Sequence, residues 1–164
     1  MILLLLALQA GDWPQYRGPD RDDLSAETGL LRAWPPEGPP LLWTYRNAGI
    51  GYSGPAVVGE RLYTLGGRDG TEFLIAVDLR KGAELWATAL GPVFQFDGNK
   101  WSAGPSATPT VADGLIYAQG GMGDLVCVDS TSGKEVWRKN LPKDLEAQVN
   151  PIGGGPKNLG WGYT

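Results

Sequence analysis

The sequence predicts an all-β protein built from repeated units of four antiparallel strands, and three observations support this fold class. A motif at residues 76–86 returns at residues 127–137, and both copies place Asp, Gly and Trp four residues apart, at Asp78, Gly82, Trp86, Asp129, Gly133 and Trp137. The 25 Gly and 13 Pro residues in a chain of 164 suit short strands and turns better than helices. Turn dipeptides such as Asp113-Gly114 separate short apolar runs, as in β-hairpins.

The repeat defines two units, residues 55–90 and residues 109–141. The strands expected in them are 56–58, 61–66, 72–78 and 84–89, and then 110–112, 115–120, 124–129 and 135–139. A period of about 50 residues is typical of a propeller or a solenoid. Because four antiparallel strands cannot bury both faces alone, we expect the units to stack around an axis as blades of a β-propeller.

The spacing between the units changes along the repeat. Pro55 and Pro109 are 54 residues apart, whereas Asp78 and Asp129 are 51 apart. The three additional residues therefore belong to the second hairpin of the first unit, and we expect a longer loop at residues 68–71.

The recurring Asp, Gly and Trp residues are expected to join blades rather than to carry chemistry. Gly82 and Gly133 suit a left-handed turn position, and an Asp that opens a turn accepts hydrogen bonds from the turn amides. A Trp on the outermost strand supplies about 150–250 Å² of surface to the neighbouring blade, on the order of 4–6 kcal/mol before entropy is subtracted. We identify no catalytic, cofactor-binding or metal-binding residue.

Residues 41–46 resemble the last strand of each unit and include Trp43, yet they precede the first unit. Residues 159–164 resemble the entry to a unit. We therefore expect an N-terminal fragment of a propeller spanning residues 41–164, with about two blades. In this view, residues 41–46 are an orphan strand that completes the last blade of the intact ring.

The first 40 residues predict export. Residues 1–10 are apolar, too short to span a membrane as a helix, and similar to the apolar part of a signal peptide cleaved after Ala10, although the usual basic segment is absent. Residues 11–40 are a leader rich in Pro and Gly that wraps or connects. The expected location is the periplasm or cell envelope, with no membrane span.

Composition excludes several kinds of site. The net charge of −4, without a basic cluster, argues against nucleic acid. The absence of His and the single Cys127 exclude a Ser-His-Asp triad, a Cys-His pair, a His-bearing zinc site and a Cys-x-x-Cys-His haem site. Cys127 is expected in the core. Residues 20–23, 121–123 and 153–157 predict turns or linkers rather than calcium or phosphate loops.

The pattern Ala-x-Asp-x-x-x-Gly-x-x-x-Trp at residues 76–86, with Cys127 in place of Ala in the second copy, resembles the tryptophan-docking repeat of pyrroloquinoline-quinone-like (PQQ-like) β-propellers. The leader at residues 12–19 is similar to the start of exported bacterial members of that family. One branch of the family, similar to BamB, implies a non-catalytic envelope scaffold that binds protein or polymer partners on the propeller faces and uses no cofactor.

The other branch implies an N-terminal fragment of a quinoprotein alcohol dehydrogenase. Such enzymes hold PQQ and calcium with a disulfide between adjacent cysteines, a Trp platform and Glu, Asn and Asp ligands. This chain has no Cys-Cys pair, and none of those ligands maps onto it. The sequence therefore favours the scaffold, with the dehydrogenase fragment as the alternative.

Overall fold

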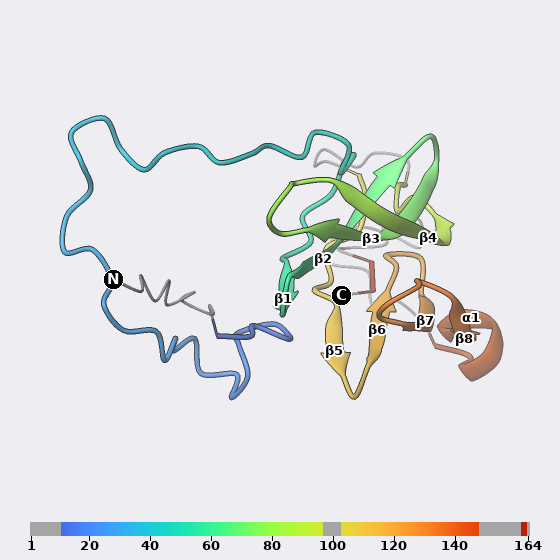
Figure 1. The fold of residues 1–164 in the computed structure, drawn as a ribbon. Helices are drawn as coiled ribbons and strands as arrows, with labels where there is room; N and C mark the ends of the chain where they lie inside the picture. The colour runs from blue at the N-terminus through green and yellow to red at the C-terminus, as the bar shows by residue number, and fades with distance from the viewer. Residues whose placement is uncertain (1–10, 97–102, 148–161, 164) are drawn as a thin grey trace, which may run out of the picture.

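Two four-stranded antiparallel sheets make up the body of the protein (Figure 1). The computed structural model describes residues 11–96, 103–147 and 162–163. The strand orders are β1-β2-β3-β4 and β5-β6-β7-β8, so each sheet is a meander in which neighbours in sequence are neighbours in space. The predicted fold class, a partial propeller of antiparallel blades, is confirmed.

The strands follow the repeat units. The first sheet contains β1 (Ala56–Val58), β2 (Arg61–Arg68), β3 (Thr71–Asp78) and β4 (Glu84–Pro92). The second contains β5 (Thr110–Ala112), β6 (Leu115–Gln119), β7 (Asp124–Asp129) and β8 (Glu135–Asn140). β2 and β4 extend beyond the ends expected at residues 66 and 89.

The prediction of a longer loop at residues 68–71 is wrong, because the additional residues lengthen the strands. β2 and β3 have 8 residues each, against 5 in β6 and 6 in β7. Asp69 and Gly70 both have positive φ, 46° and 80°, which matches a tight two-residue hairpin. Such a turn lets the ladder continue to the pair Arg68 and Thr71.

The two copies of the motif have the same local geometry. Ala76 pairs with Trp86, and Cys127 pairs with Trp137, so a small buried residue faces each Trp. In both sheets the register shifts directly after the small residue. The motif therefore combines a small residue, a local irregularity and a turn in one arrangement.

An apolar core lies between the sheets. It comprises Tyr63, Leu65, Leu74, Ala76, Leu90, Ile116, Ala118, Val126 and Val128, with Val58, Trp86, Ala107 and Val111 packed against it. Because residues of both sheets contribute, the sheets pack face to face, as adjacent blades do.

A short helix that the sequence analysis did not foresee follows β8. In α1 (Leu141–Leu145) the Asn140 side chain accepts from the Lys143 N–H as N-cap, and a proline lies in the first turn. In the described part of the chain, no helix is long and apolar enough to cross a membrane.

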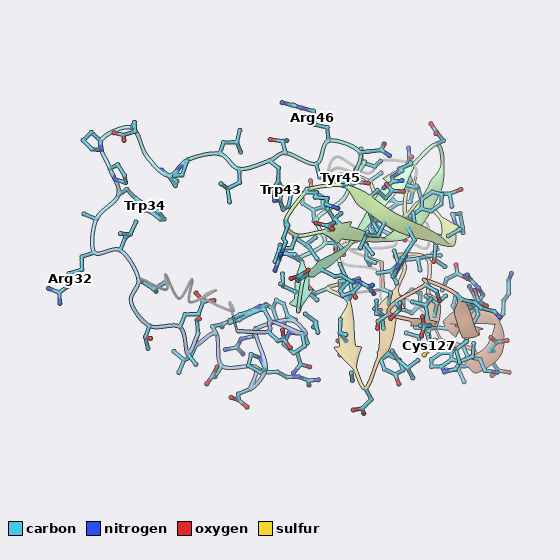
Figure 2. All side chains as sticks on the ribbon, viewed as in Figure 1. Arg32, Trp34, Trp43, Tyr45, Arg46 and Cys127 are labelled. Atoms are coloured by element: carbon cyan, nitrogen blue, oxygen red, sulfur yellow. The ribbon has the colours of Figure 1, made fainter. Side chains whose placement is uncertain are left out.

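Residues 24–42 form an arc that leaves the two sheets and returns (Figure 1). Figure 2 shows Arg32 and Trp34 on this arc, and Trp43 and Tyr45 at the first sheet. The expected strand at residues 41–46 is not formed: among the described residues, it joins neither sheet. A strand needs a neighbouring strand for its ladder, so the closing role of this segment stays a prediction.

Two other predicted segments lie largely or wholly outside the described residues. These are the signal segment 1–10 and most of the unit entry at residues 159–164. Within the latter, the Tyr163 N–H donates to the Gly121 carbonyl at 3.0 Å, which places this residue beside the second sheet.

Candidate functional site at the junction of the sheets

The motif carboxylates are engaged in their own turns. Asp78 Oδ1 accepts from the N–H groups of Arg80 and Lys81 at 2.9 and 2.8 Å. Asp129 Oδ1 accepts from the Ser132 hydroxyl at 2.6 Å and from the Ser132 N–H at 2.8 Å. These bonds, led by the one from the hydroxyl, lower the pKa of Asp129. Each carboxylate therefore shapes the turn between the third and fourth strands of its sheet.

Each motif glycine carries the ring of a Trp that comes from an earlier part of the chain. Gly82 and Gly133 have φ of 64° and 70°. A Cβ on Gly82 would lie 2.6 Å from Trp43 Cδ2, and one on Gly133 would lie 2.5 Å from Trp86 Cδ2. Only glycine provides both the left-handed conformation and the space for the ring.

The indole N–H groups complete these contacts. Trp43 Nε1 donates to the Leu79 carbonyl at 2.7 Å, and Trp86 Nε1 donates to the Thr131 carbonyl at 3.1 Å. Trp86 thereby joins the first sheet to the second, while Trp43 joins the segment 41–46 to the first sheet. Trp137 packs beside Tyr117 of its own sheet and is 40% exposed.

Arginine and threonine side chains add polar links between the sheets. Arg61 Nη1 donates to the Ser130 carbonyl at 2.9 Å, and the Thr88 hydroxyl donates to the Gly133 carbonyl at 2.6 Å. In the opposite direction, Arg138 on β8 donates to the carbonyl groups of Ala89, at 2.8 Å, and Leu90 on β4. Side chains of both sheets therefore donate hydrogen bonds across the junction.

Glu72 is a junction residue that sequence reasoning missed. It is fully buried, and its two oxygens accept from the N–H groups of Phe94 and Gly121, both at 2.8 Å. Burial raises the pKa of Glu72, while the two amide bonds oppose that rise. Glu72 on β3 therefore connects the first sheet to the hairpin between β6 and β7. The sequence feature that could have identified Glu72 is a charged residue near the start of an otherwise apolar strand.

A second missed cluster holds the segment 41–46 on the first sheet. Arg68 Nη2 donates to the Tyr45 hydroxyl at 2.6 Å and to Glu84 at 2.9 Å, and the Tyr45 hydroxyl also donates to Glu84. Burial and the bond to Glu84 raise the pKa of Tyr45 to about 12. Partial burial raises the pKa of Glu84, but hydrogen bonds from Tyr45 and Arg68 outweigh this effect and lower it.

The other residues that the sequence singled out, Cys127 and residues 121–123, lie in the core and in a turn. Cys127 is fully buried in β7 (Figure 2). Gly123 donates its N–H to the Gly120 carbonyl at 2.9 Å, so residues 121–123 form the expected hairpin turn. Residues 153–157 lie outside the described residues. Within the described ranges, there is no group of three or more Cys, Asp or Glu side chains arranged to hold a metal ion.

Comparison with known proteins gives a family match. Residues 70–155 match the model of the family described as "Outer membrane protein assembly factor BamB". None of the curated proteins matches the chain.

The solved structures that are similar to it include the following two. One is a europium-containing methanol dehydrogenase, with 24% identity and a TM-score of 0.48 over 62% of this chain and 18% of that chain. The other is BamB from Moraxella catarrhalis, with 25% identity and a TM-score of 0.38 over 59% of this chain and 30% of that one. This chain therefore spans less than a third of either protein.

The family match covers more than half of the chain and contains both copies of the motif. With the repeat and the paired sheets, it identifies this chain as a member of the PQQ-like repeat family that includes the outer membrane protein assembly factor BamB.

Proposed function

We propose that this chain belongs to a non-catalytic propeller that binds protein partners in the cell envelope. The observation that carries the proposal is that the motif carboxylates are engaged in structure: Asp78 and Asp129 accept hydrogen bonds within their own turns. These turns carry Trp43 and Trp86, and Trp86 joins the two sheets. A framework of stacked repeats presents extended faces to partners. The description of the family as an assembly factor supports partners that are proteins.

The residues described here do not fit a PQQ and calcium site. Both oxygens of the buried Glu72 are held by backbone amides, and Oδ1 of Asp78 and of Asp129 is held by the adjacent turn. Cys127 is the only cysteine of the sequence, so the adjacent pair of the quinoproteins cannot form from these residues.

The test compares binding with turnover in the purified full-length protein. We expect no alcohol-dependent reduction of an artificial dye after loading with PQQ and calcium, and we expect reproducible crosslinks to envelope proteins in intact cells. PQQ-dependent dye reduction would overturn the proposal in favour of a dehydrogenase. Fractionation of cells that express the tagged chain tests its location, and recovery in the cytosol alone would contradict export.

We further infer that residues 41–46 form the outermost strand of a blade that precedes the first sheet. Trp43 packs on the turn at residues 78–82. Trp86, on the outermost strand β4, packs in the same way on the equivalent turn at residues 129–133. Leu41 and Leu42 are more than 80% exposed, which leaves apolar surface for such a blade. Crosslinking between cysteines placed at Leu42 and in a candidate partner strand of the intact protein tests this arrangement.

A further inference from the structure

The start of the leader lies across the first strands of both sheets. The Trp13 N–H donates to the Val57 carbonyl on β1 at 2.7 Å, and the Val57 N–H donates back to the Trp13 carbonyl at 2.8 Å. One residue further on, the Pro14 carbonyl accepts from the Val111 N–H on β5 at 2.8 Å. A two-residue segment is therefore bonded to the edges of both sheets.

A side chain of the leader adds a fourth bond. Asp12 Oδ1 accepts from the Gly59 N–H, in the turn between β1 and β2, at 2.8 Å. Proline suits position 14, because it has no N–H group that would need a partner at a sheet edge. The edges thus offer an N–H donor for a carboxylate at Gly59, a two-way backbone pair at Val57 and a second N–H donor at Val111.

The leader keeps its shape through bonds of its own. The Trp13 ring lies over Gly18, which has a φ of 84°, so that a Cβ there would be 2.8 Å from the ring. Arg17 Nε and Asp23 Oδ2 form an ion pair at 2.7 Å, and the Asp23 N–H donates to the Arg17 carbonyl at 3.1 Å. Residues 12–23 therefore form a small folded segment, and its first three residues make the hydrogen bonds with the sheets described above.

We propose that the edges of β1 and β5 form a strand-docking site for an extended peptide with an acidic, an aromatic and a proline residue in succession, which the leader fills in cis. Main-chain pairing with an open edge is a general mode of peptide recognition, and it also prevents the edge from pairing with other chains. The docked strand forms hydrogen bonds with two sheets at once, so it also holds the edges of β1 and β5 together. This site goes beyond the proposed scaffold function and does not depend on it.

Hydrogen exchange in a variant that lacks residues 11–23 provides the main test. The N–H groups of Val57, Gly59 and Val111 should exchange about tenfold faster or more, because each loses its acceptor. The N–H of Val126, buried in β7, is the internal control and should keep its rate. Unchanged exchange at the three edge positions would overturn the proposal.

A synthetic peptide of residues 11–23 then tests docking in trans. It should bind the shortened protein saturably and restore slow exchange at Val57 and Val111, and the same peptide with Asp12→Ala should bind more weakly. If exchange accelerates on deletion but the peptide neither binds nor restores protection, the docking site does not exist.

A substitution in the full chain covers the case in which the shortened protein does not fold. Asp12→Ala should accelerate exchange at Gly59 about fivefold or more. Asp22→Ala is the matched control, because the Asp22 carboxylate accepts from Leu24 within the leader. Equal effects of the two substitutions at Gly59 would contradict the proposal.

Discussion

Replacement of Gly133 by alanine tests the contact between the blades directly. The substitution adds one methyl group at a backbone position with φ of 70°, and that methyl would lie 2.5 Å from Trp86 Cδ2 and 3.0 Å from Thr88 Oγ1. A left-handed conformation costs a residue with a Cβ about 1–2 kcal/mol. The overlap with the indole adds about 1–3 kcal/mol, the usual cost of an excess methyl group in a packed interior. We therefore expect a loss of about 2–5 kcal/mol in the free energy of unfolding.

Gly114 offers a matched control in the same sheet. Its φ is 77°, but a Cβ there would have no neighbouring atom within 4 Å. Gly114→Ala should therefore cost only the conformational term, about 1–2 kcal/mol. Urea unfolding of both variants, followed by Trp fluorescence, gives the difference that belongs to the indole contact.

A double-mutant cycle with Trp86→Ala separates the two contributions further. Once the indole is absent, Gly133→Ala should cost about as much as Gly114→Ala, with a coupling of about 1–3 kcal/mol between positions 86 and 133. If Gly133→Ala and Gly114→Ala are equally destabilising, or if the coupling is zero, Trp86 does not join the blades in the way described.

Three further predictions concern other junction residues. Because burial raises the pKa of Glu72, the folded protein binds a proton at this carboxyl more tightly than the unfolded chain does. The stability gained from this proton is present below the pKa of the unfolded state and is lost as pH rises through the pKa of the folded state. Unfolding measured across pH should show that wild type loses stability over this window relative to Glu72→Gln, and parallel curves would contradict the assignment. Arg138→Met should lower the free energy of unfolding by about 1–3 kcal/mol, since the carbonyl groups of Ala89 and Leu90 lose their charged donor; a loss no larger than that of an exposed Lys139→Met would refute this role. Trp43→Ala should release the end of the arc and speed limited proteolysis at residues 24–42, whereas Trp34→Ala, at a position that is 67% exposed, should not.

Strand positions were largely predictable, since local signals set them. Turn glycines and the spacing of Asp78 and Asp129 locate the ends of β3 and β7 to the residue. The extent of β2 and β4 was not predictable in this way, because a strand continues as long as its neighbour supplies ladder partners. The arrangement at residues 41–46 depends in the same manner on a neighbour, so an apolar, strand-like sequence was insufficient for a strand.

The junction itself divides into predictable and unpredictable parts. The repeat identified Gly82, Gly133, Trp43 and Trp86 as residues of interest, since periodic recurrence is visible in a single chain. The repeat could not reveal the partners of Glu72, because this residue has no counterpart in the second copy and its amide partners lie 22 and 49 residues away.

By itself, the sequence determined the repeat, the antiparallel strands and the residues that recur at each turn, because these depend on contacts between near neighbours and on the backbone preferences of Gly, Pro and Asp. Only the tertiary structure decided which groups meet across the junction: the Arg138 guanidinium with the β4 carbonyl groups, and the leader with the edges of β1 and β5. These contacts join segments 40 or more residues apart, and their partners are mostly backbone groups, which every residue type carries and no sequence pattern distinguishes.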